Sequence, residues 1–287
     1  MSDSLKLAIQ KKGRLSDDSQ GLIKSCGIKY PSMKNVLMTS STNFPIDMLF
    51  MRDDDIPQYV DDGVADIGIV GENEFLEKAM DVKIIKRLGF SKCRLCLALP
   101  RAFDYKGLSD FNGKSIATSY PVILEKFLSE NNIDAEIHEI TGSVEIAPSI
   151  GLAEGIFDIV STGSTLLMNG LKEVHTVMKS EALLIANNEL TPKKQAILDK
   201  LLFRMESVYQ AKSSKYILLN APNTSIEKIV NLLPGMRSPT ILPLHGTEGW
   251  SSIHSVVSED AFWDIIDKLK QAGAEGILVL PIEKMIL

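Results

Sequence analysis

One stretch of this chain occurs twice, and that repeat constrains the fold more than any other feature. Residues 63–73 align without a gap against residues 155–165, and the copies share a glycine, an aspartate, an isoleucine and a second glycine. Each copy has the pattern of a turn, a buried strand and a glycine-containing loop that leads into a helix. The repeat predicts two similar α/β lobes whose strand ends face a shared cleft, the usual ligand site of open sheets. Because Gly-x-x-Asp-Ile is also a common turn into a strand, a chance likeness is the alternative.

Composition and charge narrow the classes of protein that fit. A length of 287 residues predicts about two domains, and 45% hydrophobic residues suffice for sizeable cores without disulfides or structural metals. The odd count of three cysteines suits a reducing compartment, and the formal net charge of −6 argues against a general nucleic-acid binder. The N-terminus lacks the apolar segment of a signal peptide, and no apolar run approaches the roughly 18 residues of a membrane span. We therefore expect a cytoplasmic protein that binds neither nucleic acid nor membrane.

The first two hundred residues alternate between predicted strands and helices. Ser16 or Asp17 is expected to cap the first helix and Gly27 to end it, while Pro57 is tolerated in the first turn of the second. The predicted elements are strands at 5–10, 64–70 and 94–99, a helix that begins at 53–55, a loop at 71–73 and a long helix at 192–211.

The last quarter of the chain has a different pattern. Strands are predicted at 216–219, 240–244, 253–257 and 277–280, with helices at 225–233 and 259–271. This βαββαβ order is that of a ferredoxin-like module and sets 212–287 apart as a compact domain. Small appended modules of this kind are commonly regulatory, although the fold alone does not establish such a role.

Candidate functional groups are densest in the second copy of the repeat. A predicted strand that contains Asp158 ends in a loop of small residues, Ser161 to Thr165, of which all but Gly163 carry a hydroxyl. Backbone N–H groups, hydroxyl donors and the start of a helix suit a phosphate monoester, and Gly163 allows the backbone to approach it closely. An ordinary Ser/Thr helix cap is the alternative that the loop alone leaves open.

The acid, the hydrophobic pair and the hydroxyl-rich loop resemble the phosphoribosyl-diphosphate (PRPP) loop of phosphoribosyltransferases. The common salvage enzymes carry two adjacent acids before this loop, and here Phe157 stands at the first acid position. A wider set of residues resembles the signature of the ATP phosphoribosyltransferase family, the first enzymes of histidine biosynthesis: Glu145, Gly151, Ala153, Ile156, Asp158, Thr162, Gly163, Thr165 and Leu166. Further segments that resemble the family are 10–15, 51–57, 71–73, 117–121 and 238–240. The resemblance covers essentially the whole chain, including the C-terminal module of the long, self-regulated form.

This resemblance implies an α/β fold with two lobes like those of type II periplasmic binding proteins around a cleft, and an ACT-type ferredoxin-like domain. The implied domains are a first catalytic lobe at 1–96 with 178–211, a second lobe at 97–177 that carries the PRPP loop, and a regulatory histidine-binding domain at 212–287.

The implied reaction transfers 5-phosphoribose from PRPP to N1 of the adenine of ATP and releases pyrophosphate, with Mg²⁺ held mainly by the substrate phosphates. Such a displacement at the sugar C1 needs two anions to be positioned and the departing pyrophosphate to be stabilised. The implied catalytic residues are Arg14, Arg52, Glu145 and Asp158. The implied PRPP-binding residues are Asp158, Ser161, Thr162, Gly163, Ser164 and Thr165. The implied ATP-binding residues are Lys11, Gly13, Arg14, Gly71, Glu72 and Asn73. Arg94 is a further candidate cation.

The resemblance also implies feedback inhibition by histidine and assembly of dimers into hexamers. The implied histidine-binding residues are Asn220, Met236, Ser238, Thr240 and Gly276. These are also ordinary turn and strand-end residues, so a purely structural module is the alternative.

Other functions fit the sequence less well. A bilobal small-molecule-binding protein shares the repeated turns but not the hydroxyl-rich loop, and a purine-salvage phosphoribosyltransferase is disfavoured by Phe157 and by the extra module. Cys93 and Cys96 lie three apart on a predicted strand and point to opposite faces, which does not favour a redox or zinc pair. We expect the aspartates at 53–55 to interact with a helix start rather than a metal.

Overall fold

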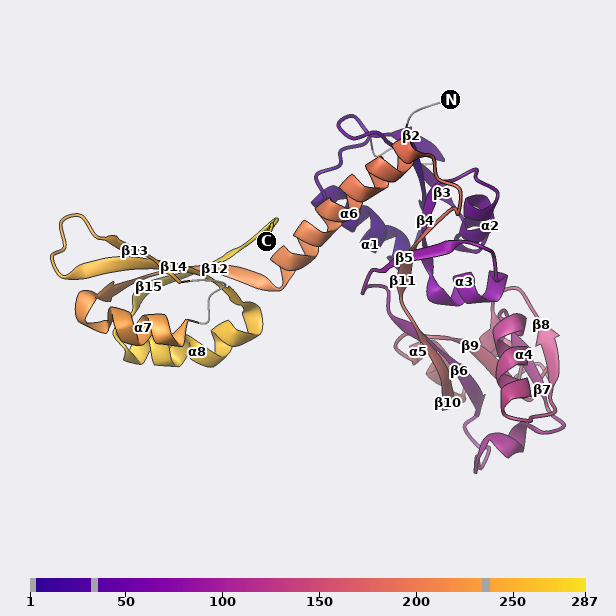
Figure 1. The fold of residues 1–287 in the computed structure, drawn as a ribbon. Coiled ribbons are helices and arrows are strands. Elements are labelled where there is room, and N and C mark those ends of the chain that lie inside the picture. The colour runs from indigo at the N-terminus through magenta and orange to yellow at the C-terminus, as the bar shows by residue number, and fades with distance from the viewer. Residues whose placement is uncertain (1–3, 32–35, 234–237) are drawn as a thin grey trace. The chain divides into compact units, whose positions relative to one another are not determined.

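The computed structural model describes residues 4–31, 36–233 and 238–287 (Figure 1). The chain divides into two compact units, Met1–Lys24 with Ile28–Ile197 and Ser25–Gly27 with Leu198–Leu287. None of the helices in these ranges combines the length and the apolar character that a membrane crossing needs. The unit boundary falls inside helix α6 (Pro192–Lys212), and the domain boundaries at 97, 178 and 212 stay predictions.

The first unit contains a six-stranded sheet in the order β2-β3-β1-β4-β11-β5, which with its helices we call the first lobe. Its elements are β1 (Leu5–Gln10), α1 (Arg14–Ser25), β2 (Met38–Ser40), β3 (Ile46–Met51), the 3₁₀ turn η1 (Asp53–Asp55), α2 (Ile56–Asp61), β4 (Ile67–Gly71), α3 (Glu72–Lys78), β5 (Lys83–Arg87) and β11 (Ala182–Ala186). Strand β1 runs parallel to both β3 and β4, so the carboxyl ends of these three strands lie at one edge of the sheet.

A five-stranded sheet in the order β10-β6-β9-β7-β8 forms the second lobe. Its elements are β6 (Cys93–Pro100), η2 (Leu108–Phe111), β7 (Ser115–Thr118), α4 (Pro121–Glu130), β8 (Glu136–Glu139), η3 (Val144–Ile146), β9 (Gly155–Val160), α5 (Ser164–Met168) and β10 (Leu171–Ser180). Strands β7, β8 and β9 are parallel, and β6 is antiparallel to β9. Fully buried Leu95, Phe111 and Phe157 form the centre of a core on which α4 packs.

The start of the first helix differs from the prediction. Helix α1 begins at Arg14, so Ser16 and Asp17 lie inside its first turn and neither caps it. The backbone N–H of Asp17 donates to the carbonyl of Gly13 at 3.1 Å, and Gly13 adopts a φ of +104°, which favours glycine. The short Gly13 turn places Arg14 immediately beyond the end of β1.

The two copies of the repeat do not share one strand register. Strand β4 starts at Ile67 and runs through Gly71 directly into α3, so the predicted strand at 64–70 began too early and the predicted loop at 71–73 is wrong. Strand β9 starts at Gly155 and ends at Val160, which leaves 161–163 as a loop before α5. The second glycine of each copy, Gly71 or Gly163, immediately precedes a helix. Of the two copies, the second alone therefore provides a loop at its strand end.

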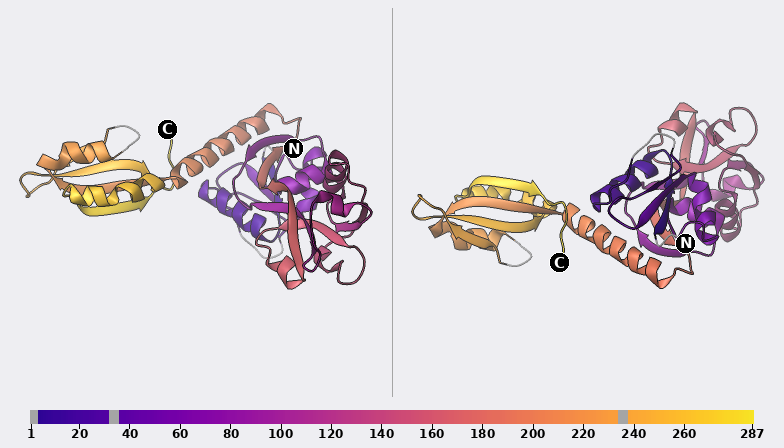
Figure 2. Two further views of the ribbon diagram at one scale, coloured as in Figure 1. Left: turned by 90° about the horizontal axis from the view of Figure 1, so that it is seen from below. Right: turned by 90° about the horizontal axis from the view of Figure 1, so that it is seen from above.

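The second unit has the predicted βαββαβ order. Its elements after α6 are β12 (Ser214–Pro222), η4 (Asn223–Ser225), α7 (Ile226–Leu232), β13 (Thr240–Pro243), β14 (Trp250–Ser258), α8 (Glu259–Gln271) and β15 (Glu275–Pro281). They form an antiparallel sheet in the order β13-β14-β12-β15, with α7 and α8 side by side against it (Figures 1 and 2). The Ser258 hydroxyl caps α8 by accepting from the Ala261 N–H at 3.3 Å.

Candidate functional site

The predicted cations of the first lobe follow the parallel strands. Lys11, Gly13 and Arg14 come directly after β1, and Arg52 comes directly after β3. The backbone N–H of Lys11 donates to the carbonyl of Met51 at 2.8 Å, which fixes these two strand ends beside each other. Because Gly71 ends the parallel strand β4, the structure brings all the predicted first-lobe residues to one edge of the sheet.

In the second lobe, the hydroxyl-rich loop follows β9. Ser161, Thr162, Ser164 and Thr165 are exposed and Gly163 adopts a φ of +82°. The Thr162 and Ser164 hydroxyls lie 2.9 Å apart. Helix α5 has five residues, so the local N–H groups and hydroxyls, rather than a long helix dipole, make this loop suitable for an anion.

A hydrogen bond connects the two lobes at this loop. The Arg14 guanidinium donates from Nη1 to the Ser161 hydroxyl at 3.0 Å and from Nη2 to the Lys92 carbonyl at 2.5 Å. The side chain thus reaches from the strand edge of the first lobe to the loop of the second. An anion bound at the loop would lie beside this cation.

Arg94 holds the same loop through its backbone. Its Nη1 donates to the Ser161 carbonyl at 3.1 Å, while its Nε and Nη2 form a bidentate pair with Oε1 and Oε2 of Glu173 at 3.1 and 2.7 Å. Hydrogen bonding to Arg94 lowers the pKa of Glu173 to about 2, so the pair stays charged at neutral pH. Arg94 therefore fixes the loop rather than offering a free guanidinium to a substrate.

Asp158 lies within β9, two residues before the strand ends. Burial raises the pKa of its carboxyl to about 6; the Ile159 N–H, which donates to it at 2.7 Å, lowers the pKa, and the charge of Glu145 raises it further. The structure therefore places the two predicted carboxylates within electrostatic range of each other.

Arg52 is exposed, and its guanidinium forms a bidentate pair with Asp54, with both N–O distances at 2.9 Å. Asp53 accepts a hydrogen bond from Gln10 at 2.9 Å. Arg52 and Asp54 line a cavity of about 370 Å³ whose wall also includes Tyr120 of the second lobe. The predicted cleft between the lobes is therefore present on this side.

Two of the predicted ATP-binding side chains are engaged within the protein. Glu72 pairs with Arg87, with Oε2 and Nη1 at 2.7 Å. Asn73 is buried and hydrogen-bonded to Ser180, Glu74 and Tyr120. Their contact with a nucleotide stays a prediction.

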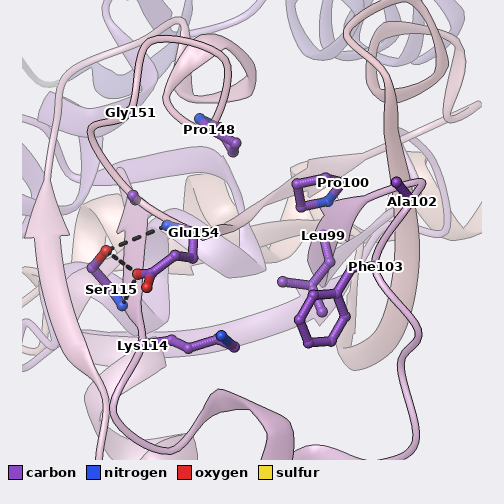
Figure 3. Close-up of a pocket in the computed structure, with 10 residues that line it drawn as sticks. Leu99, Pro100, Ala102, Phe103, Lys114, Ser115, Pro148, Gly151 and Glu154 are labelled. Atoms are coloured by element: carbon purple, nitrogen blue, oxygen red, sulfur yellow. Dashed lines mark hydrogen bonds between the residues drawn. The ribbon is translucent and has the colours of Figure 1, made fainter.

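A second cavity lies at the opposite edge of the five-stranded sheet (Figure 3). It measures about 660 Å³ and lies at the amino ends of β7 and β9, with Pro100, Lys114 and Glu154 in its wall. The Ser115 hydroxyl and N–H both donate to Glu154, at 2.6 and 2.7 Å. None of the predicted substrate residues lines it, so it is separate from the candidate substrate cleft.

Carboxylates near the loop are candidate ligands for a metal ion that binds with the substrates. The described ranges contain no group of three histidine, cysteine, aspartate or glutamate side chains arranged to hold a metal. Cys26, Cys93 and Cys96 are free, and Cys93 and Cys96 both lie on β6, as predicted. Asp158, which lies two residues before the strand end, and Glu145, whose charge acts on Asp158, are carboxylates that could supply oxygen ligands.

In the second unit, Asn220 and Gly276 lie on the adjacent strands β12 and β15. A Cβ on Gly276 would lie 3.5 Å from Asn220 Nδ2. Thr240 lies on the edge strand β13, separated from β12 by β14, and Ser238 is exposed just before it. Met236 falls outside the described residues.

Comparison with known proteins identifies the family. The family model described as ATP phosphoribosyltransferase matches residues 52–207, more than half of the chain, and the model described as HisG, C-terminal domain, matches residues 211–284. The chain belongs to the ATP phosphoribosyltransferase family. An ATP phosphoribosyltransferase of Bacteroides thetaiotaomicron is 61% identical over 99% of this chain and all of its own length. One from Cytophaga hutchinsonii is 57% identical over the full length of both.

Solved structures agree with this family. A chain of the ATP phosphoribosyl transferase (HisG:HisZ) complex from Thermotoga maritima is 28% identical, with a TM-score of 0.59 over 70% of this chain and 98% of that chain. Tv2483, solved bound to L-arginine, is 8% identical with a TM-score of 0.51 over 74% of this chain and 87% of its own, and shows a shared fold alone. The comparisons confirm the α/β fold and the C-terminal HisG domain.

The ATP phosphoribosyltransferase assignment confirms the predicted enzyme class and the first step of histidine biosynthesis as its reaction. It favours that reaction over a bilobal binding protein and a purine-salvage enzyme. The sequence interpretation missed the buried polar group formed by Asn73, Glu74, Tyr120 and Ser180. Tyr120 lies in a segment that resembles the family, but nothing in its local pattern shows that its hydroxyl reaches the other lobe.

Proposed function

We propose that the second lobe binds PRPP through the loop at 161–165 and that the first lobe presents ATP from the edge formed by β1, β3 and β4. The observation that carries this proposal is the Arg14–Ser161 hydrogen bond, because it places a first-lobe cation at the second-lobe loop. The loop N–H groups and hydroxyls would hold the 5-phosphate, and Asp158 would accept hydrogen bonds from the ribose hydroxyls.

Arg14 and Arg52 then have the task of stabilising negative charge as pyrophosphate leaves. Displacement at C1 develops positive charge on the sugar and negative charge on the leaving group, so fixed cations on the leaving-group side lower the barrier. Arg52 is neutralised by Asp54 here, and it would exchange that partner for a phosphate. Lys11 adds a further exposed cation next to β1.

Mg²⁺ is the metal that we propose for this site. When bound, it would neutralise charge on the pyrophosphate oxygens, with Asp158 or Glu145 as protein ligands. In this proposal the ion enters the site together with the substrate phosphates.

We further propose that histidine inhibits the enzyme by binding the second unit near Asn220 and Gly276, and that the chain forms a homo-oligomer. The side-chain amide of Asn220, which is half-buried beside Gly276, offers a donor and an acceptor to an amino acid. We place the enzyme in the cytoplasm, as its composition and cysteine count indicate.

An assay with alternative acceptors tests the reaction. The protein is mixed with PRPP, Mg²⁺ and either ATP or a free purine base, and phosphoribosyl-ATP is followed by its absorbance. We expect turnover in the mixture that contains ATP and none in the mixture that contains a free base. Turnover with a free base and none with ATP would contradict the proposed function.

A further inference from the structure

A buried polar group joins the two lobes at a distance from the phosphate loop. Tyr120 precedes α4, and its ring packs into the second-lobe core with Leu124 and Phe157. Its hydroxyl leaves that core and donates to Oε1 of Glu74, on α3 of the first lobe, at 2.8 Å. One side chain is thus anchored in one lobe and hydrogen-bonded in the other.

The same group extends to the chain segment that crosses between the lobes. Ser180 ends β10 in the second lobe, and β11 of the first lobe begins at Ala182. The Ser180 hydroxyl donates to Oδ1 of Asn73 at 2.9 Å and accepts from the Asn73 N–H at 3.1 Å. The Asn73 amide in turn donates to the Tyr120 hydroxyl at 3.2 Å.

A second carboxylate on α3 binds the start of α4. Glu77 accepts from the N–H groups of Val122 and Ile123 at 2.9 and 3.0 Å, which satisfies two of the free donors in the first turn of that helix. Glu74 and Glu77 are three residues apart on α3 and so face the same neighbour. Helix α3 therefore contacts α4 through a side-chain hydroxyl and through the backbone.

The Tyr120 hydroxyl is a permanent donor in this position. Burial, and then the charge of Glu74, raise its pKa, so it remains protonated at every physiological pH. Glu74 is buried too, and its carboxylate is satisfied by Tyr120 and Asn73. Loss of one member leaves buried partners without hydrogen bonds, which favours a different arrangement of the two lobes.

We propose that Tyr120 and Glu74 are positioning residues for phosphoribosyl transfer, and that their hydrogen bond sets the separation of the lobes at which the two substrates react. The proposal rests on the assignment of PRPP to the second lobe and ATP to the first. Substrates held on different lobes react only when C1 and N1 come within about 3–3.5 Å, and a shift of about 1 Å can cost about 100-fold in rate.

The test compares Tyr120→Phe with wild type in the full-length protein. The change removes one hydroxyl and keeps the ring, and Lys11, Arg14 and the loop at 161–165 make no hydrogen bond to that hydroxyl among those the structure shows. We expect kcat to fall by about 10- to 100-fold, while the dissociation constants for PRPP alone and ATP alone stay within about threefold of wild type. Tyr105→Phe is the matched control, because Tyr105 packs in the same lobe against Phe111; its kcat should equal that of wild type.

A double variant separates positioning from general damage. If Tyr120→Phe and Glu74→Ala remove the same bond, the double variant should lose no more kcat than the more damaging single variant. Should Tyr120→Phe fail to fold, Ser180→Ala tests the network from the crossing segment and should also lower kcat without weakening binding of either substrate.

Three results would overturn the inference. They are an unchanged kcat in Tyr120→Phe, an equal loss in Tyr105→Phe, and a loss confined to the affinity for one substrate. If the wild-type protein forms phosphoribosyl-ATP, each of these results contradicts the inference and leaves the proposed function unaffected. Wild-type protein that forms no phosphoribosyl-ATP would overturn the proposed function and this inference together.

Discussion

Two arginines near the loop at 161–165 act on it differently. Arg14 donates to the Ser161 hydroxyl from the other lobe and remains exposed, whereas Arg94 is paired with Glu173 and binds the Ser161 carbonyl. Because Arg94 bonds Glu173 and the loop backbone at once, it restricts the backbone rather than adding free charge for a phosphate. The sequence does not show that the two arginines have different partners, because the residues next to an arginine do not indicate what its side chain binds.

Burial raises the pKa of the Asp158 carboxyl, which lies close to this loop. Its folded pKa of about 6 lies above the ordinary value of 3.8, so the folded state retains a proton that the unfolded chain has released. The wild-type protein therefore loses stability as pH rises from about 4 to about 6. Glu145 adds to this effect through its charge.

The variant Asp158→Asn tests this linkage. We expect the variant to be more stable than wild type above pH ~6, by up to ~3 kcal/mol, with no difference below pH ~4. Urea unfolding at several pH values measures it. If the ionised carboxylate binds the ribose, wild-type kcat/KM for PRPP rises through pH ~6, whereas the variant stays low and flat. A pH-independent stability difference would contradict the assigned pKa.

At the scale of elements, the sequence predicted the strands and helices well where the pattern was continuous. Strand β1 was predicted with the bounds that the structure has, and the ferredoxin-like order was predicted in full. The repeat predicted the bounds of its two strands less well, because the residues that the copies share do not specify where each strand begins. Asp66 precedes β4 and pairs with Lys194 at 2.7 Å, whereas the matching Asp158 lies inside β9. Contacts between distant residues decide these roles, and a single sequence does not show them.

Two strands, β6 and β10, hold the loop at 161–165 in place through side-chain hydrogen bonds. Arg94 on β6 binds Glu173 on β10 and the loop carbonyl of Ser161. Arg94→Lys keeps the charge but removes the planar, bidentate geometry. We expect KM for PRPP to rise about tenfold, with the dissociation constant for ATP unchanged, in steady-state assays and direct titrations. Arg101→Lys, an exposed change beyond the far end of β6, is the control. An equal effect on both substrates would argue against a role confined to the loop.

At the scale of the whole molecule, the chain consists of two units that each have their own core. The first contains both lobes, and the second packs Ile217, Leu219 and Ile253 between its sheet and helices. A separate core is consistent with a module that binds its own ligand. The sequence predicted this module from its order of elements, but the residues proposed to bind histidine do not all lie together: Thr240 is two strands from Asn220.

Removal of residues 212–287 tests the regulatory proposal. We expect the truncated chain to keep turnover and lose inhibition by histidine, measured as activity against histidine concentration. Asn220→Ala in the full chain is the companion variant, and the histidine concentration for half-inhibition should rise about tenfold through loss of one polar contact. Inhibition that survives the truncation would place the effector site in the first unit.

The central claim is that the loop at 161–165 binds the phosphate of PRPP, and Thr162→Ala tests it most directly. Thr162 is exposed, and its hydroxyl contacts Ser164 within the loop, so the change removes a phosphate donor with little effect on the core. Titration of each substrate alone measures the two dissociation constants. We expect PRPP binding to weaken by about tenfold while ATP binding is unchanged. Equal losses for both substrates, or a loss for ATP alone, would contradict it.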